Sequence, residues 1–127
     1  MIKKLAPVLI VDRIEPLLPL WDALGFQRTA EVPHGDALGF VILARDGIEV
    51  MYQTRASVGA DEPQVLGGAH PLGAAALFIE VDDVDAMARA LPAGTDVVNA
   101  RRTTFYGSTE TIFRDGAGNL ITLAQMA

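Results

Sequence analysis

Two glutamates stand in strand-like apolar segments, where a carboxylate could do chemistry. Glu49 follows Ile48 in one such run, and Glu80 comes two residues after Phe78 in another. An ionised carboxylate beside aromatic faces suits a cationic or planar ligand. A carboxyl whose pKa is raised by burial can instead act as a general acid or base, and Glu49 is the candidate for that role. At this point both binding and catalysis stay open.

Other reactive residue types are sparse. The chain has no cysteine, which excludes disulfides and thiolate metal sites, and it has two histidines. His34 and His70 stand beside proline and glycine, and their spacing matches no chelating pattern, so we expect surface histidines. The sequence also has no serine–histidine–aspartate order, phosphate loop or dinucleotide fingerprint. It therefore predicts no metal ion and no cofactor.

Length and charge narrow the function classes further. With 127 residues, half of them apolar, the chain can bury the core of one domain. Its formal charge of −6 argues against nucleic acid, whose phosphates require a basic surface. The first apolar run, residues 5–11, is broken by Pro7 and is too short for a signal peptide or a membrane span. We expect a cytoplasmic protein whose partner is a small molecule, with neither nucleic acid nor a membrane.

The elements that position the glutamates occur twice along the chain. Residues 8–12 form a β-rich apolar run closed by an acidic residue, and residues 78–82 repeat it 70 positions later (78 − 8 = 70). An amphipathic segment follows each run, at 14–24 and at 84–91. The acidic residues at the turns can cap these helices. Pro19 falls inside the first helix, which we therefore expect to be short or kinked.

Each copy then ends in a hairpin. Asp-Gly turns between strand-like runs are strong hairpin signals, and Arg-Asp-Gly recurs 69 residues apart (115 − 46 = 69). A two-residue turn predicts the register of the first hairpin, and a four-residue loop, 115–118, predicts that of the second. The expected pairs are Phe40 with Gln53, Ile42 with Met51, Ala44 with Glu49, Thr111 with Thr122, and Phe113 with Leu120.

The two copies are expected to form one domain, because each half of about 60 residues would be only marginally stable alone. Residues 55–73, rich in glycine, alanine and proline, have the composition of a linker. The prediction is a single α+β domain over 1–127, with module one at 1–54, a linker at 55–73 and module two at 74–127.

The motifs, in this order and spacing, resemble the vicinal-oxygen-chelate superfamily, which includes glyoxalases, bleomycin-resistance proteins and extradiol dioxygenases. The resemblance implies duplicated βαβββ modules whose mixed sheets curl around a cleft, usually in a homodimer. The residues that carry it are Val11-Asp12, Leu24-Gly25-Phe26, Val81-Asp82-Asp83-Val84, Tyr106-Gly107, and the run from Phe113 to Asn119. The segment 20–26 and the Arg-Asp-x-Ala-Gly-Asn ending look most similar to the bleomycin-resistance branch.

Metal-dependent members of that superfamily place ligands on the first and last strand of each module. The corresponding positions in this chain are Ala6, Glu49, Ala76 and Thr122. Alanine has no donor atom, and a neutral threonine hydroxyl is a poor ligand for a divalent cation. Three of the four expected ligands are thus missing, which favours binding over metal-dependent catalysis.

Strand alternation predicts what lines the cleft instead of a metal centre. The expected lining is mostly apolar, with two carboxylates and two hydroxyls, as suits a small-molecule site. Phe105 and Tyr106, on a loop before an inward-facing strand, are expected to form a lid, and Trp21 is expected in the core. The predicted ligand-binding residues are Phe40, Glu49, Met51, Phe78, Glu80, Phe105, Tyr106, Thr111, Phe113 and Thr122.

The sequence therefore predicts metal-independent binding of a small hydrophobic or cationic molecule, by resemblance a bleomycin-type glycopeptide that is sequestered from its target. One alternative is a metal-free enzyme, such as a lyase, isomerase or dioxygenase-like member, that uses Glu49 as its acid or base. Another is a relative whose cleft is filled and which acts as a protein-interaction module.

Overall fold

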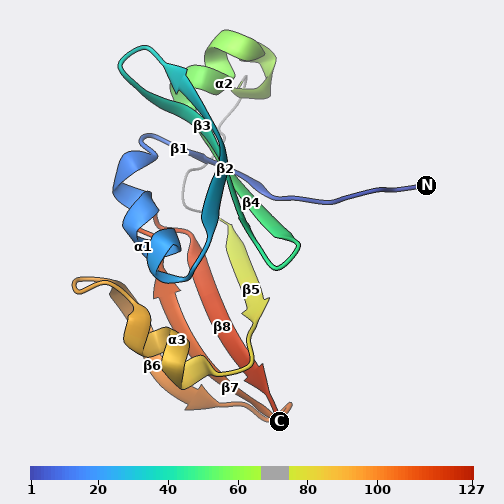
Figure 1. Ribbon diagram of the computed structural model, residues 1–127, viewed down its shortest axis with the longest axis vertical. Helices are drawn as coiled ribbons and strands as arrows, with labels where there is room; N and C mark the ends of the chain where they lie inside the picture. The colour runs from blue at the N-terminus through green and yellow to red at the C-terminus, as the bar shows by residue number, and fades with distance from the viewer. Residues whose placement is uncertain (67–74) are drawn as a thin grey trace. The chain divides into compact units, whose positions relative to one another are not determined.

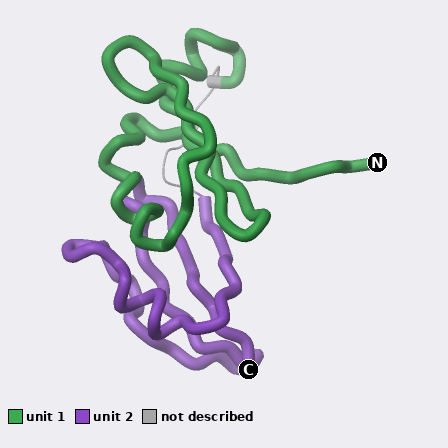
Figure 2. The backbone as a smooth tube through the Cα atoms, in the orientation of Figure 1, with its two compact units in different colours: residues 1–71 green, residues 72–127 purple. Residues whose placement is uncertain are grey.

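The computed structural model describes residues 1–66 and 75–127 and divides the chain into two compact units. Unit 1 comprises residues 1–71 and unit 2 comprises residues 72–127 (Figure 2). The predicted surface position of His70 lies outside the described residues. None of the helices in the described ranges is long and apolar enough to cross a membrane.

Unit 1 carries a four-stranded mixed sheet with the strand order β1-β4-β3-β2 (Figure 1). The first strand pairs in parallel with β4, and the remaining neighbours are antiparallel. Its elements are β1 (Val8–Val11), the 3-10 helix η1 (Glu15–Leu17), α1 (Leu18–Ala23), β2 (Gln27–His34), β3 (Ala37–Arg45), β4 (Ile48–Thr54), α2 (Arg55–Asp61) and the 3-10 helix η2 (Pro63–Leu66).

Unit 2 repeats this topology with the strand order β5-β8-β7-β6. Its first strand is again parallel to its last, and α3 packs on β7 and β8. The two sheets and three α-helices of the described residues confirm the predicted α+β class. The elements of unit 2 are β5 (Ala76–Glu80), α3 (Val84–Ala90), β6 (Asp96–Thr103), β7 (Ser108–Arg114) and β8 (Leu120–Met126).

The helix after the first strand is short in each unit. In unit 1 a 3-10 turn leads into a six-residue helix with Pro19 in its first turn, where a missing N–H costs no hydrogen bond. No side chain caps that helix. In unit 2 the side chain of Asp83 caps α3 by accepting a hydrogen bond from the Ala86 N–H at 3.0 Å. The predicted short first helix is confirmed, and acidic capping holds for the second copy only.

Trp21 lies in the core of unit 1, as predicted. Its indole Nε1 donates to the Tyr52 hydroxyl at 3.0 Å, and both side chains are fully buried. The ring of Phe26 packs edge-on against Trp21, with centroids 4.9 Å apart. These contacts place α1 against the face of β4 that carries Tyr52.

The segment predicted to be a linker begins with helix α2. The Thr54 side chain caps this helix by accepting a hydrogen bond from the Ser57 N–H at 3.1 Å. The high content of small residues in 55–73 therefore did not prevent one short, capped helix from forming. The organisation of the chain as one domain stays a prediction.

The first hairpin has the predicted register. Phe40 pairs with Gln53, and Ala44 pairs with Glu49. The turn residues Asp46 and Gly47 have φ angles of 52° and 78°, and two successive left-handed residues are the mark of the tight turn that suits twisted hairpins. The Asp-Gly signal thus fixed both the turn and the register.

The predicted register of the second hairpin is wrong by one residue. Thr111 pairs with Leu123 rather than Thr122, and Phe113 pairs with Ile121 rather than Leu120. The loop holds five residues, because the Asp115 carboxylate accepts hydrogen bonds from the Asn119 N–H at 3.0 Å and the Asn119 side-chain amide at 2.8 Å. A one-residue shift moves a side chain to the other face of a sheet.

Candidate functional site

Each sheet has one face toward its short helix and one face away from it, which we call the open face. On the open face of unit 1, strand pairing places three of the predicted residues, Phe40, Glu49 and Met51, together. All three are half-buried. The predicted apolar surface is therefore present in this unit, although the environment of its carboxylate differs from the expectation.

Glu49 forms an ion pair with the N-terminal segment. Its Oε2 lies 2.5 Å from the Lys4 Nζ, and its side chain is 23% exposed. Sequence analysis did not reveal this partner, because 45 residues separate Lys4 from Glu49. The ion pair with Lys4 favours the charged carboxylate and therefore opposes proton transfer to Glu49.

The open face of unit 2 carries Phe78, Glu80 and Thr122. Phe78 is 57% exposed and lies in register with Thr122 on the neighbouring strand. Glu80 shares the face with Phe78, two residues along the same strand. Within the described residues, no side chain or backbone group forms a hydrogen bond or ion pair with the Glu80 carboxylate.

Thr111 and Phe113 lie on the opposite, helix-facing side, which corrects their predicted place. Phe113 is fully buried, and the Thr111 hydroxyl donates to the Ala100 carbonyl at 2.9 Å. Both follow from the one-residue shift in the second hairpin, and both side chains stabilise the core of unit 2.

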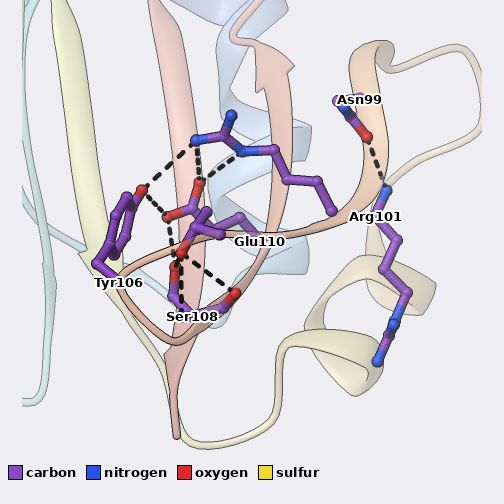
Figure 3. A network of polar contacts seen from close by, with 7 residues as sticks. Asn99, Arg101, Tyr106, Ser108 and Glu110 are labelled. Carbon is purple, nitrogen blue, oxygen red and sulfur yellow. Dashed lines mark hydrogen bonds and ion pairs between the residues drawn. The ribbon is translucent and has the colours of Figure 1, made fainter.

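A buried carboxylate that the sequence analysis missed, Glu110, organises the open face of unit 2. Its side chain is 1% exposed. One oxygen accepts a hydrogen bond from the Arg102 Nε at 3.0 Å and forms an ion pair with the Arg102 Nη2 at 2.9 Å. The other accepts from the Tyr106 hydroxyl at 2.6 Å and the Ser108 hydroxyl at 2.8 Å (Figure 3). We call these four residues the Glu110 cluster.

The cluster holds its carboxylate in the ionised form at neutral pH. Burial raises the pKa of Glu110, but the hydrogen bonds from Tyr106, Ser108 and Arg102, with the charge of Arg102, outweigh burial and leave this pKa below its ordinary value. The hydrogen bond to Glu110 correspondingly raises the pKa of Arg102. Two opposite charges are thus fixed beside each other on the sheet.

A tight turn between β6 and β7 presents the predicted aromatic pair. The Thr104 N–H donates to the Ser108 carbonyl at 2.9 Å, and Gly107 has a φ angle of 89°. Phe105 is fully exposed, and its ring packs edge-on against Tyr106 with centroids 5.1 Å apart. The Tyr106 hydroxyl is committed to Glu110, so the pair is anchored at one end. Its contact with a ligand stays a prediction.

A separate depression of about 500 Å³ opens at the β3–β4 turn of unit 1. It includes none of the predicted site residues. The Arg45 guanidinium at its edge donates to the Leu24 carbonyl and pairs with Asp46 at 3.1 Å, so its charged groups satisfy one another. The lining residues are Gly25, Gln27, Thr29, Ala44, Arg45, Asp46 and Gly47.

Comparison with models of protein families assigns this duplicated chain to a superfamily. Residues 6–123 match the model of the Glyoxalase/Bleomycin resistance protein/Dioxygenase superfamily. The chain belongs to this superfamily. A search of curated protein sequences finds no match.

Several solved structures share the fold of this chain. A glyoxalase/bleomycin resistance protein/dioxygenase family enzyme from Burkholderia phytofirmans PsJN is similar at 15% identity and a TM-score of 0.75, over 96% of this chain and 97% of that one. TioX from Micromonospora sp. ML1 is 20% identical, with a TM-score of 0.73 and coverage of 98% and 100%. An integron cassette protein from Vibrio cholerae is 25% identical, with a TM-score of 0.64 and coverage of 100% and 98%.

The residues at the superfamily's metal positions do not fit a divalent cation. The residue that pairs in register with Ala76 is Leu120 and not Thr122. If Leu120 is taken as the last-strand ligand position of unit 2, that position also has no donor atom. Glu49 is held by Lys4. Across the described ranges, no group of three or more histidine, aspartate or glutamate side chains is placed to hold a metal ion.

Proposed function

We propose that this superfamily member binds a small hydrophobic or cationic molecule without a metal ion, and sequesters it stoichiometrically. The contact surface is the open face of unit 2 around Phe78, Glu80 and Thr122. We further propose that the chain acts in the cytoplasm as a homodimer, a state that sedimentation analysis of the purified protein tests directly.

The observation that supports this proposal is the exposure of Phe78 beside a carboxylate that lacks a positively charged partner among the described residues. Phe78 and Glu80 stand two apart on one strand, so their side chains share a face about 7 Å apart. An aromatic ring and an ionised carboxylate at that spacing attract a planar cation through the face of the ring and the charge. Thr122, beside Phe78, supplies a hydroxyl for orientation.

The enzyme alternative depends on Glu49 and predicts turnover instead of stoichiometric capture. In unit 1 this carboxylate is already paired with Lys4, and the face around it is apolar. A general base also requires a substrate proton within hydrogen-bond reach. Binding on unit 2 is therefore the function we place first, and ligand recovered unchanged after incubation separates it from catalysis.

Isothermal titration of metal-free bleomycin into chelator-treated protein tests the proposal. We expect micromolar or tighter binding, with Kd raised about fivefold or more in Phe78→Ala and in Glu80→Gln, because central contacts contribute about 1 kcal/mol or more. Val97→Ala is the matched control, since Val97 is comparably exposed but pairs with Phe113 on the other face of the sheet.

Equal affinity in all three variants would overturn the assignment of the site to Phe78 and Glu80. Absence of heat, together with absence of thermal stabilisation by the drug, would remove the bleomycin-type ligand. Binding that requires added zinc or manganese would contradict a metal-independent function. Conversion of the ligand that Glu49→Gln abolishes would establish the enzyme alternative.

A further inference from the structure

Arg102 uses only part of its guanidinium to hold Glu110. Its Nε and Nη2 bind the carboxylate, and Nη2 also lies 3.4 Å from the Tyr106 hydroxyl. The two N–H groups of Nη1 have no hydrogen-bond partner in the described part of the chain. The side chain is 44% exposed, so a ligand can reach it from solvent.

Glu110 has little capacity left to bind a ligand itself. Its two oxygens together accept three hydrogen bonds and form an ion pair with the Arg102 Nη2, which occupies most of the acceptor capacity of a carboxylate. Its side chain is also almost completely buried. The role that remains for Glu110 is to position the arginine, which offers its outer edge.

We propose that the outer edge of Arg102 is a binding site for an oxyanion, a carboxylate or phosphate group carried by a ligand. Guanidinium groups bind such anions through charge-assisted N–H donors, and the two N–H groups of Nη1 remain for this purpose. Glu110 and Tyr106 fix the side chain before the ligand arrives, which lowers the entropy lost on binding. The fully exposed ring of Phe105 in the adjacent turn favours an oxyanion attached to a planar apolar body.

This site does not depend on the proposed function. It lies on the outer strand β6, whereas Phe78 and Glu80 lie on β5 at the opposite edge of the same sheet. It also calls for ligand groups of the opposite charge. A molecule that engages both sites would carry a cationic group at one end and an acidic group at the other.

The chain offers a matched control for Arg102 in its neighbour. Arg101 has the same charge and is exposed, but it pairs with Asp85 on α3, and its side chain runs away from the cluster (Figure 3). Replacing either arginine by glutamine changes the net charge equally. Any difference between the variants therefore reports position rather than overall charge.

NMR titrations of the protein with benzoate, inorganic phosphate and benzamide test the site. Benzamide is the uncharged counterpart of benzoate. We expect benzoate or phosphate to shift signals of residues 102–106, and benzamide to shift them far less. In Arg102→Gln the anion Kd should rise about tenfold or more, and in Arg101→Gln it should change less than about twofold.

Arg102→Lys keeps the charge without the planar fork, and we expect it to weaken anion binding as well. Equal loss in the two glutamine variants, or shifts as large with benzamide as with benzoate, would overturn the proposal. So would the absence of binding by both anions. The same titration of Phe78→Ala should leave the anion response unchanged, so that failure of this site and failure of the bleomycin-type function are told apart.

Discussion

The open faces of the two units have the same backbone and opposite chemistry. In unit 1 one row across the sheet reads Ile10, Gln53, Phe40 and Val32, from β1 through β4 and β3 to β2. In unit 2 the corresponding row reads Glu80, Ala124, Glu110 and Arg102. Three of these four positions are related by 70 residues (80 − 10, 110 − 40 and 102 − 32).

The difference teaches that duplication conserved the fold and not the site. A phenylalanine in unit 1 corresponds to a nearly fully buried carboxylate in unit 2, which folding tolerates because three hydrogen-bond donors and the charge of Arg102 surround it. The helix-facing sides, in contrast, stay alike: Leu43 and Phe113, again 70 residues apart (113 − 43), are both fully buried. Stability therefore depends on the shared faces, and the recognition that we propose depends on the faces that diverged.

The largest effects are expected from the shared, helix-facing sides. Phe113→Ala and Leu43→Ala should each lower the free energy of unfolding by about 3 kcal/mol, because both remove a large side chain from a packed core. Urea unfolding monitored by circular dichroism measures the loss. Phe78→Ala, on the open face, is the control and should cost less than about 1 kcal/mol. A loss at Phe113 no larger than the loss at Phe78 would contradict the register of the second hairpin.

A smaller loss is expected where the two open faces differ. Glu110→Ala should lower the free energy of unfolding by about 2 kcal/mol, because the donors of Arg102, Tyr106 and Ser108 lose a charged acceptor. Phe40→Ala, at the corresponding half-buried position of unit 1, should cost about 1 kcal/mol. The same urea titration compares the two variants, and equal losses would mean that the cluster contributes no more than ordinary apolar contact.

The charged row also predicts how the protein responds to acid. The pKa of Glu110 is lower in the folded chain than its ordinary value of 4.5, so folded protein binds this proton more weakly than unfolded protein. The stabilisation that the ionised Glu110 contributes to the folded state is therefore complete above about pH 4.5, and it is lost as the pH falls toward the pKa of Glu110 in the folded chain. Thermal unfolding at pH 3 to 7 should show a smaller drop in Tm for Glu110→Gln than for the unchanged chain.

Unit 1 supplies the comparison for this titration. The pKa of Glu15 is also lowered, chiefly because its carboxylate accepts a hydrogen bond from the Leu38 N–H at 2.7 Å. Glu15→Gln should remove a separate part of the acid sensitivity, and the double variant should remove both parts. A pH profile that neither substitution changes would show that other groups control acid unfolding.

Much of the fold could be predicted because its signals are local. Apolar runs, an Asp-Gly turn and the 70-residue repeat were enough for the strands, the first register and the superfamily. The second register failed because the loop is closed by side-chain bonds between Asp115 and Asn119, which spacing alone does not reveal. The repeat of 70 places Glu110 at the position of Phe40 and predicts the observed face of this strand, whereas the assumed four-residue loop, 115–118, was one residue too short.

The site was harder to predict because its partners are distant or join different strands. Nothing near Glu49 in the sequence points to Lys4, and the cluster gathers donors from β6, β7 and the turn between them. Because residues 108 and 109 are also polar, the sequence around Glu110 looks like that of a solvent-exposed strand. Its burial becomes visible only once Arg102 is paired with it across the sheet.

The smallest effect is expected at the carboxylate of unit 1. The Lys4–Glu49 pair is open to solvent, and exposed ion pairs contribute about 0–1 kcal/mol because water competes for both charges. A double-mutant cycle with Lys4→Ala and Glu49→Ala should give a coupling energy near 0.5 kcal/mol, roughly halved by 1 M salt. The cycle of Arg102→Ala with Glu110→Ala should give a larger coupling that salt screens less, since one partner is buried. Equal coupling energies in the two cycles would contradict this prediction, because they would mean that Lys4 stabilises the Glu49 carboxylate as strongly as Arg102 stabilises the Glu110 carboxylate.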